Sequence, residues 1–288
     1  MAELWKGAPA AAALTQRVAD QAAALRANGV TPTLAIVRVG ERPEDLAYER
    51  GALKRCEQAG VAVRPFLLSQ QVGQEELLDV IAQINSDPAI HGCLLFRPLP
   101  PHLDEAAVCA ALSPAKDVDG VTAGSLAAVF SGTGQGFPPC TAQACLELLD
   151  FHGYDLTGKR AVVVGRSLVI GRPVAMLLLQ RNATVTLCHT RTADLAAECR
   201  RADVLIAAAG RAGVIGPDCL APGQVVLDVG INAGADGGLV GDVDFPAAQS
   251  LAAAITPVPG GVGSVTTSVL ISHVVRAAQR ATNQEGCG

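Results

Sequence analysis

A segment in the second half of the chain has the residue types of a phosphate-binding turn. It follows a run of small apolar residues at 161–164, is bounded by Gly165 and Gly171, and leads through Pro173 into a predicted helix. Where a buried strand turns directly into a helix, backbone N–H groups at the helix N-terminus can bind a pyrophosphate. The spacing G-x-S-x-x-x-G differs from the commoner G-x-G-x-x-G, so the segment alone fits a nucleotide site or an ordinary strand-to-helix turn equally well.

The end of the next predicted strand favours NADP over NAD. About 20 residues after the turn, an NAD site usually has an acidic residue for the ribose hydroxyls. The chain has His189, Thr190 and Arg191 there, and no acid. Two cations and a hydroxyl, which suit a 2′-phosphate, are offered by Arg166, Arg191 and Thr190. For His189, a strand-end histidine bonded to backbone is the favoured interpretation.

Glycines follow two later predicted strands of the same series. Gly210 and Gly230 stand at the carboxyl ends of these strands, where a residue without a side chain lets a ligand approach the backbone closely. The turn at 256–263, which contains Pro-Gly-Gly, then leads into the last predicted helix. This turn can be a stiff linker that returns the chain to the first domain, a wall of a binding site, or both.

The elements that position these residues form two series along the chain. Short apolar runs alternate with helical periods, which is typical of parallel sheets covered by helices. A stretch rich in glycine and proline at 113–140, which includes Gly134, separates the two series and predicts a domain junction. The predicted strands are 34–40, 63–68, 92–96, 161–164, 184–187, 204–207 and 225–229, and the predicted helices include 43–59, 75–85 and 265–281.

Composition and charge favour a packed globular protein. The chain has 288 residues, of which half are hydrophobic and 17% are charged, which favours two domains and argues against long disorder. A net charge of −5 without runs of like charge offers no attraction for nucleic acid or an anionic membrane. No apolar run reaches the roughly 18 residues of a membrane span. The first residues, with Glu3 and Lys6 ahead of an alanine run, make a poor signal peptide.

The cysteine pattern predicts neither a disulfide framework nor a zinc site. Nine cysteines, from Cys56 to Cys287, are odd in number, scattered and never spaced as C-x-x-C. Cys140 follows two prolines, and because the sequence places no His or Lys to activate it, we expect it to pack rather than react. We therefore expect a soluble protein of a reducing cytoplasm, without a metal site.

Several of these segments together resemble the bifunctional 5,10-methylenetetrahydrofolate dehydrogenase/cyclohydrolase family. The resemblance covers nearly the whole chain, in the family's order. It implies a folate-binding catalytic domain of residues 1–140 plus 266–288, an NADP-binding Rossmann domain of residues 141–265, a folate cleft between them, and a homodimer formed through the nucleotide domain. The matching stretches are Lys116–Gly120, Pro139–Thr141, Gly165–Pro173, Cys188–Thr190, Gly241–Phe245 and Thr256–Gly263.

The resemblance also implies roles for individual residues. In the family, the tyrosine of a Y-x-x-x-K pattern stacks on the folate, and the second aspartate of K-D-V-D-G holds the pterin end, which gives catalytic roles to Tyr48 and Asp119. We expect Asp117, the first acid of that motif, to cap a turn through its side chain. The implied substrate-binding residues are Tyr48, Ala52, Phe96, Pro98, Leu99, Asp119, Gly260 and Gly261. The implied cofactor-binding residues are Gly165, Arg166, Ser167, Ile170, Gly171, Thr190, Arg191, Gly210, Ile231 and Thr266.

Two positions depart from the family's pattern, and both affect one catalytic function. The main catalytic group in the family is the lysine four residues after the tyrosine, and this position is Ala52 here. The glutamine that supports the lysine, in the string V-Q-L-P-L-P, is Phe96. On a helix, Ala52 lies about 40° around from Tyr48 on the same face.

If this segment is a helix, no neighbouring cation takes the place of this lysine. Lys54 lies about 120° and Arg50 about 160° around the helix from Tyr48, so both point elsewhere. Arg55 lies within about 20° of Tyr48 around the helix, but it is roughly 10 Å further along the helix axis. An arginine is also permanently charged and cannot accept a proton.

The loss of the lysine should affect the family's two reactions differently. Water attack on the methenyl carbon needs a positioned group that removes a proton. Hydride transfer from the methylene carbon to nicotinamide needs mainly alignment of two rings, because the folate nitrogen stabilises the cation that forms. The sequence thus predicts an NADP-dependent 5,10-methylenetetrahydrofolate dehydrogenase with cyclohydrolase activity absent or strongly reduced. Two alternatives stay open: a fully bifunctional enzyme that uses another base or a bound water, and a non-catalytic protein that binds folate or nucleotide.

Overall fold

The computed structural model describes residues 1–133, 136–234 and 237–285, so Gly134 and Cys287 lie outside the described residues. The chain divides into two compact units, and each consists of a parallel sheet with helices. The predicted α/β class with two domains is therefore confirmed. The six-stranded unit contains Met1–Ala12 and Thr141–Thr266, and the three-stranded unit contains Ala13–Cys140 and Thr267–Gly288.

The N-terminal segment belongs to a different unit from the one that the sequence predicts. Residues 1–12 are expected in the first domain, but they lie in the six-stranded unit because β1 (Glu3–Leu4) pairs in parallel with β11 (Ala254–Ile255). The backbone N–H of Gly7 also donates to the Gly260 carbonyl at 2.8 Å. Each of these strands has two residues, which is too short to give a strand pattern in the sequence.

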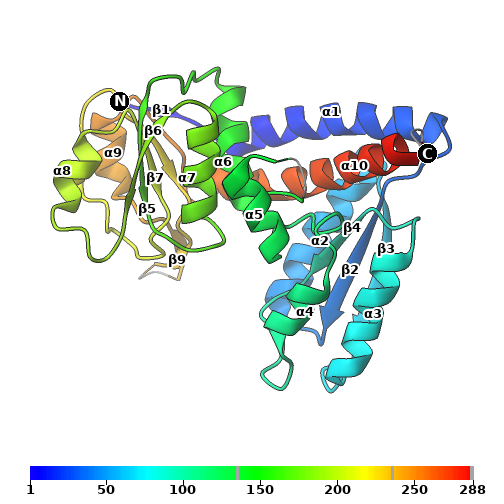
Figure 1. Ribbon diagram of the computed structural model, residues 1–288. Helices are drawn as coiled ribbons and strands as arrows, with labels where there is room; N and C mark the ends of the chain where they lie inside the picture. Colours follow the sequence, from blue (N-terminus) through cyan, green and yellow to red (C-terminus); the bar gives the residue numbers. More distant parts are fainter. Residues whose placement is uncertain (134–135, 235–236, 286–288) are drawn as a thin grey trace. The chain divides into compact units, whose positions relative to one another are not determined.

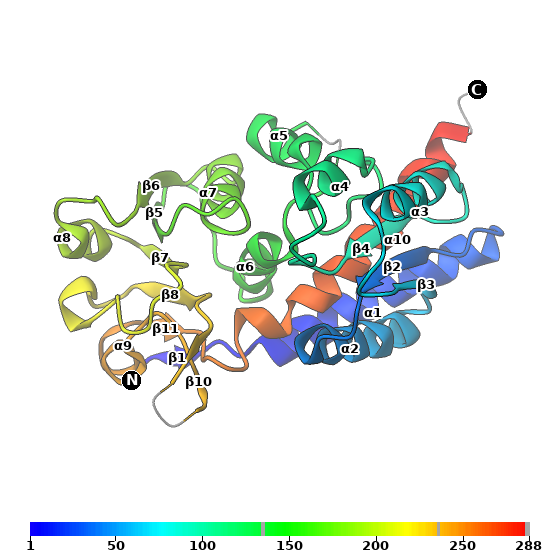
Figure 2. The same cartoon turned by 90° about the horizontal axis from the view of Figure 1, so that it is seen from below.

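The three-stranded unit is built around the apolar strand β2. Its parallel sheet has the order β3 (Ala62–Leu68), β2 (Thr33–Val39), β4 (Gly92–Leu95). Because β2 is central and covered on both faces, its residues after Thr33 form an apolar run that is interrupted by Arg38. Figure 2 shows α2 and α3 on opposite faces of this sheet. The helices of this unit are α2 (Pro43–Ala59), α3 (Gln74–Ser86), α4 (Glu105–Ala111) and α5 (Ala123–Ser131), together with most of α1 (Gly7–Ala27) and of α10 (Thr266–Glu285).

The six-stranded unit is a parallel sheet covered on both faces, with α6 and α7 on one face and α8 and α9 on the other (Figure 1). The strand order is β1-β11-β8-β7-β5-β6, and every pair is parallel. All carboxyl ends therefore meet at one edge of the sheet. The strands are β5 (Arg160–Val164), β6 (Thr184–Cys188), β7 (Val204–Ala207) and β8 (Val225–Asp228), with a separate antiparallel pair β9 (Asn232–Ala233) and β10 (Leu239–Val240). The helices are α6 (Cys140–Phe151), α7 (Gly171–Gln180), α8 (Leu195–Arg200) and α9 (Phe245–Leu251), and the 3₁₀ turns are Pro217–Cys219 and Val262–Ser264.

The seven predicted strands are all present, but several helices are not predicted by the sequence analysis. The stretch 113–140, interpreted as irregular, contains α5, which begins where the Thr122 hydroxyl accepts from the Ser125 N–H at 3.1 Å. Gly124 lies in the first turn of this helix, no proline lies within it, and Gly132 ends it with a φ of 71°. The alanine run near the N-terminus forms most of the first part of α1, as expected for the residue with the highest helix propensity. Within the described ranges, no helix is long and apolar enough to cross a membrane.

Candidate active site

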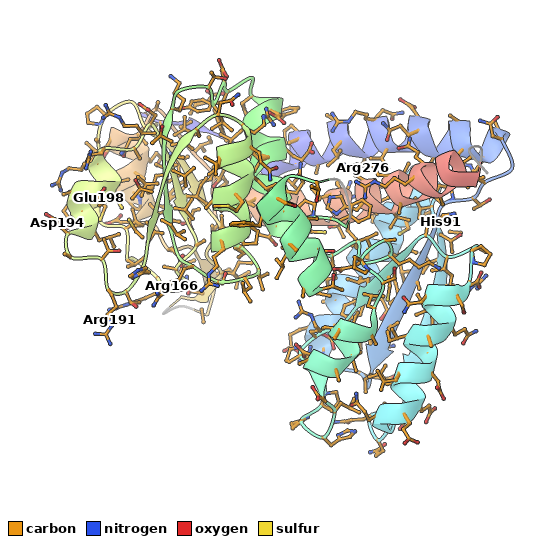
Figure 3. All side chains as sticks on the ribbon, viewed as in Figure 1. His91, Arg166, Arg191, Asp194, Glu198 and Arg276 are labelled. Atoms are coloured by element: carbon orange, nitrogen blue, oxygen red, sulfur yellow. The ribbon has the colours of Figure 1, made fainter. Side chains whose placement is uncertain are left out.

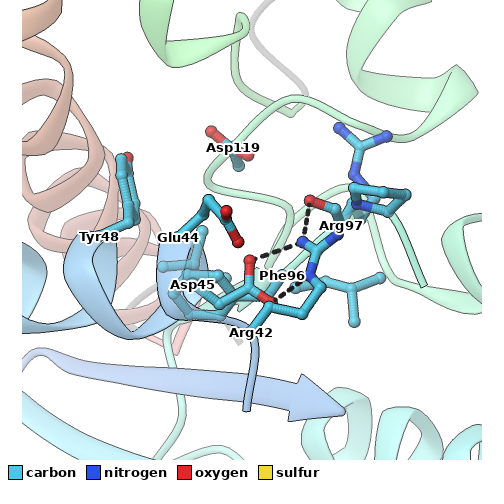
Figure 4. Close-up of a pocket in the computed structure, with 10 residues that line it drawn as sticks. Arg42, Glu44, Asp45, Tyr48, Phe96, Arg97 and Asp119 are labelled. Carbon is cyan, nitrogen blue, oxygen red and sulfur yellow. Dashed lines mark hydrogen bonds and ion pairs between the residues drawn. The ribbon is translucent and has the colours of Figure 1, made fainter. Parts of the chain in front are cut away.

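A pocket of about 430 Å³ lies in the three-stranded unit between the first turns of α2 and the segment that follows β4. It brings together four residues that the sequence analysis assigns to the substrate, namely Tyr48, Phe96, Pro98 and Asp119 (Figure 4). It also contains four charged residues that the sequence analysis did not single out: Arg42, Glu44, Asp45 and Arg97. We call it the α2 pocket.

An aromatic pair forms one wall of the α2 pocket. Tyr48 is 38% exposed, whereas Phe96 is only 7% exposed. The two rings meet edge to face, with centroids 5.9 Å apart and planes 81° apart. The Phe96 N–H donates to the Val37 carbonyl at 3.0 Å, which continues the hydrogen bonding of β4 with β2. The buried phenylalanine thus supports the more exposed tyrosine, on which a flat ring system can stack.

The residue at the position of the family's lysine is buried away from the α2 pocket. Ala52 is 0% exposed and does not contact the α2 pocket, although it lies one turn after Tyr48 on α2. Its methyl group is too short to reach the pocket from that position. The prediction that Ala52 contacts the substrate is therefore not supported by the geometry of this pocket.

The cations near Ala52 point away, as helix geometry predicts. Lys54 and Arg50 are exposed, and the Arg55 guanidinium donates to the Thr15 hydroxyl at 3.4 Å. None of the described residues that line the α2 pocket is a lysine. The cations of the pocket are two arginines, which cannot act as proton acceptors.

These arginines are held by carboxylates and backbone. Arg42 forms a bidentate ion pair with Asp45, at 2.6 and 2.9 Å, and also donates to the Arg97 carbonyl at 3.0 Å (Figure 4). The Arg97 guanidinium lies 3.4 Å from the Glu105 carboxylate, which also accepts from the Leu99 N–H at 2.8 Å. The network fixes the segment after β4, including the cis Arg97-Pro98 peptide. The i,i+3 spacing of Arg42 and Asp45 was the only sequence signal for it.

The two acids of the Lys116–Gly120 motif have different roles. Asp117 is fully buried, and its carboxylate accepts from the N–H groups of Val121 and Thr122 at 3.0 and 2.7 Å, which confirms the predicted turn cap. Asp119 lines the α2 pocket. Withdrawal from water raises the pKa of Asp119 to about 6, although a hydrogen bond from the Cys140 thiol acts in the opposite direction. A carboxylate accessible to the pocket near neutral pH can accept hydrogen bonds from a ligand.

Cys140 has a histidine partner that the sequence did not reveal. His273, on α10, places Nδ1 3.9 Å from the Cys140 sulfur and 2.9 Å from the Val118 carbonyl. Burial raises the pKa of the Cys140 thiol well above its usual value and lowers the pKa of His273 to about 3. Both groups are therefore neutral at physiological pH, and the thiol is not activated as a nucleophile. The expected packing role agrees with this geometry.

Not every predicted substrate residue lies in the α2 pocket. Leu99 lines an adjacent pocket of about 490 Å³ together with Gly40, Gln70 and Pro100. Gly260 and Gly261 belong to the six-stranded unit, in the turn that leads to α10. Thr266, predicted to bind the cofactor, is the first residue of α10.

The predicted phosphate turn in the six-stranded unit is a tight cradle. Gly165 follows β5 with a φ of 128°, a conformation that favours glycine. A Cβ on Gly165 would lie 2.0 Å from the Ala208 carbonyl oxygen, and a Cβ on Gly171 would lie 2.0 Å from the Gly165 carbonyl oxygen. The Ser167 hydroxyl accepts from the Ile170 and Gly171 N–H groups at 3.1 and 3.4 Å. These residues fit a dinucleotide, because the glycines let the backbone close on itself at the start of α7.

The other predicted cofactor residues lie at the same edge of the sheet. Thr190 and Arg191 follow β6, Gly210 follows β7 and Ile231 follows β8, and all four are exposed. Figure 3 shows Arg166 and Arg191 on one side of this unit. His189 accepts from the Arg191 N–H at 3.0 Å, which agrees with a histidine bonded to backbone. Within the described residues, no group of His, Cys, Asp and Glu could hold a metal ion.

Comparison with known proteins gives the same result for both halves of the chain. The family model "Tetrahydrofolate dehydrogenase/cyclohydrolase, catalytic domain" matches residues 5–119, and the model of the "NAD(P)-binding domain" of the same name matches residues 139–282. The bifunctional protein FolD of Carboxydothermus hydrogenoformans is 49% identical over 281 residues, which are 97% of this chain and 98% of the relative.

Two solved structures are similar over nearly their whole length. The bifunctional FolD methylenetetrahydrofolate dehydrogenase/cyclohydrolase of Campylobacter jejuni has a TM-score of 0.93 at 36% identity, covering 97% of this chain and 99% of its own. The Trypanosoma brucei enzyme of the same type, complexed with NADP and an inhibitor, has a TM-score of 0.89 at 34% identity, covering 98% of both chains.

Proposed function

The chain belongs to the tetrahydrofolate dehydrogenase/cyclohydrolase family of enzymes, with an NAD(P)-binding domain in its second half, and from this premise we propose a specialised activity. It oxidises 5,10-methylenetetrahydrofolate to 5,10-methenyltetrahydrofolate by hydride transfer to NADP. Its cyclohydrolase activity is absent or strongly reduced. The three-stranded unit binds the folate, and the six-stranded unit binds the cofactor.

The observation that carries the proposal is the composition of the α2 pocket. Ala52, at the lysine position, is fully buried, and the described lining residues include no lysine. The ring of Phe96 occupies the position of the supporting glutamine and packs against Tyr48. General acid–base assistance typically accelerates a step by about 10²–10⁴-fold. A pocket without the amine loses an acceleration of this order for the addition of water to the methenyl carbon.

The dehydrogenase step uses residues that are present. Tyr48 stacks on the folate rings, and the Asp119 carboxylate accepts hydrogen bonds from the amino and ring N–H groups of the pterin. The bound NADP supplies the hydride acceptor. Alignment of the two rings is the main requirement of this step, and the chain meets it by binding and orientation rather than by proton transfer.

The choice of NADP is supported by charge at the edge of the six-stranded unit. Arg166 and Arg191 are exposed near the ends of β5 and β6, where a 2′-phosphate would add negative charge. The T. brucei relative was solved with NADP. We propose that this chain uses the same cofactor.

Location and assembly follow as further parts of the proposal. All cysteines within the described ranges are free, which supports a reducing cytoplasm. In the described part of the sheet, β6 is an edge strand, and an edge presents unpaired backbone groups to another chain. We propose a homodimer formed through this unit.

The test begins with the dehydrogenase. Purified protein is mixed with 5,10-methylenetetrahydrofolate and NADP, and formation of NADPH is followed by absorbance. The proposal predicts steady turnover. A flat trace with retained binding of both ligands would instead support a non-catalytic binding protein, and rapid hydrolysis of isolated methenyltetrahydrofolate would support a fully bifunctional enzyme.

A further inference from the structure

Asp242 follows β10 and is fully buried, and its carboxylate is surrounded by donors. Oδ2 accepts from the backbone N–H groups of Ala209 and Gly210 at 2.6 and 3.0 Å. Oδ1 accepts from the backbone N–H of Arg211 and from the side-chain amide of Asn232, both at 2.9 Å. A buried carboxylate is costly unless such donors replace water. Asp242 therefore ties the loop after β7 to the segment after β8.

The loop that Asp242 holds lies against the predicted phosphate turn. Residues 209–211 are exposed at the carboxyl end of β7, although their N–H groups point to a buried carboxylate. The preceding Ala208 carbonyl is the group that a Cβ on Gly165 would meet at 2.0 Å. The position of the loop and the position of the turn are thus coupled by direct packing.

A second buried acid holds Asp242 in place. The Asp228 carboxylate accepts from the N–H groups of Gly230, Asp242 and Val243 at 3.0, 2.9 and 3.0 Å. Glycines make room for both carboxylates. A Cβ on Gly230 would lie 2.2 Å from Oδ1 of Asp242, and a Cβ on Gly241 would lie 1.9 Å from Oδ2 of Asp228.

We propose that Asp242 is a positioning residue for the dinucleotide. It acts through the backbone of Ala209–Arg211 and through Asn232, which it fixes in the arrangement that binds the cofactor. The inference rests on the proposed function, because it takes the carboxyl edge of the six-stranded unit as the NADP site. It gives a role to the Gly241–Phe245 motif, for which the sequence resemblance implied none.

The test is the variant Asp242→Asn in the full-length protein. The asparagine amide has the size of the carboxylate, but one of its two polar atoms is an NH₂ donor. In either orientation of the amide, this NH₂ group faces one of the two pairs of donors that Asp242 accepts from. We expect the Kd for NADP, measured by titration calorimetry, to rise at least tenfold. The KM for NADP should rise similarly, while kcat at saturating NADP changes less than threefold.

A matched control separates positioning from general destabilisation. Asp244, two residues later, caps α9 by accepting from the Ala247 N–H at 3.1 Å and does not bond to the loop at 209–211. Asp244→Ala should lower the unfolding midpoint and leave the Kd for NADP unchanged. If Asp242→Asn is folded and lowers only the midpoint, with the same Kd as the wild type, the positioning role is overturned.

A milder variant tests the same inference if Asp242→Asn does not fold. Asn232→Ala removes one of the four donors and should raise the Kd for NADP about threefold, whereas an unchanged Kd contradicts the inference. Wild-type protein that does not bind NADP at all would overturn the proposed function itself. Wild-type binding with unaffected variants would overturn only the role of Asp242.

Discussion

The α2 pocket is lined by charged and aromatic side chains, whereas the turn after β5 is built from glycines and backbone groups. In and beside this pocket, the residues at positions 96 and 52 differ from the family's glutamine and lysine, which changes the groups that can assist a reaction. At the turn, function depends on how closely the backbone approaches itself around Gly165 and Gly171. Under the proposed function, the first region sets which reaction is catalysed, and the second region sets whether the cofactor binds.

The largest effect is expected for Asp119→Ala. The substitution removes the pocket carboxylate that we propose accepts from the pterin, so kcat/KM for methylenetetrahydrofolate should fall about 100-fold or more. Steady-state assays at saturating NADP measure it. Asp79→Asn, an exposed acid on α3 of the same unit, is the control and should leave the rate unchanged. Equal rates for Asp119→Ala and the wild type would remove this acid from the site.

The next effect concerns the backbone turn. Gly165→Ala places a methyl group 2.0 Å from the Ala208 carbonyl oxygen at a φ of 128°, so the turn must open. We expect the Kd for NADP to rise at least tenfold, with no change in folate binding to the other unit. Gly158→Ala is the matched control, because Gly158 also has a positive φ of 72° but has no atom within 4 Å of the added Cβ. Similar losses of NADP binding in both variants would mean that backbone strain, rather than the cradle, is responsible.

The α2 pocket should give the folate reaction a pH dependence. The pKa of Asp119 is raised to about 6, so the carboxylate proposed to accept from the pterin is lost as the pH falls through this value. Below pH 6, kcat/KM for the folate should drop about tenfold per pH unit. Asp119→Asn should abolish this part of the profile.

The raised pKa of Asp119 also makes the free energy of unfolding depend on pH, in the direction opposite to that of the folate reaction. Because the pKa of Asp119 is raised above 3.8, the folded protein favours the neutral acid. Its contribution to the free energy of unfolding is full below about pH 4 and is lost as the pH rises through about 6. Urea unfolding of the wild type and Asp119→Asn between pH 4 and 7 measures this contribution as a difference that grows with pH.

The smallest effect is expected for the double variant Ala52→Lys with Phe96→Gln. It restores the family's residue types, but Ala52 is buried and the lysine lacks the surroundings that would orient it. Hydrolysis of methenyltetrahydrofolate should rise a few-fold above the wild type. The single variant Lys54→Ala, which removes a cation facing away from the pocket, should not change either activity.

The sequence predicts the parts of this account that depend on local patterns. The strands with apolar runs of four or more residues and the turn at 165–171 follow from spacing along the chain. The two-residue pairing of β1 with β11 carries no such pattern and is seen only in the structure.

Contacts between distant segments could not be predicted. Arg42 meets the Arg97 carbonyl across 55 residues, and Cys140 meets His273 across 133 residues. The donors around Asp242 come from 10 to 33 residues away. Such pairs depend on how the strands order themselves in the sheets, which a single sequence does not reveal.

The proposed loss of cyclohydrolase activity is measured as the hydrolysis of isolated methenyltetrahydrofolate by the purified wild-type protein, followed by the loss of its absorbance against a buffer blank. The same preparation must first form NADPH from methylenetetrahydrofolate. We predict that hydrolysis stays at or near the uncatalysed rate while the dehydrogenase turns over. Hydrolysis at a rate comparable to that of the dehydrogenase would contradict the proposed function, because the lysine that assists this step in the family is absent from the described lining of the α2 pocket.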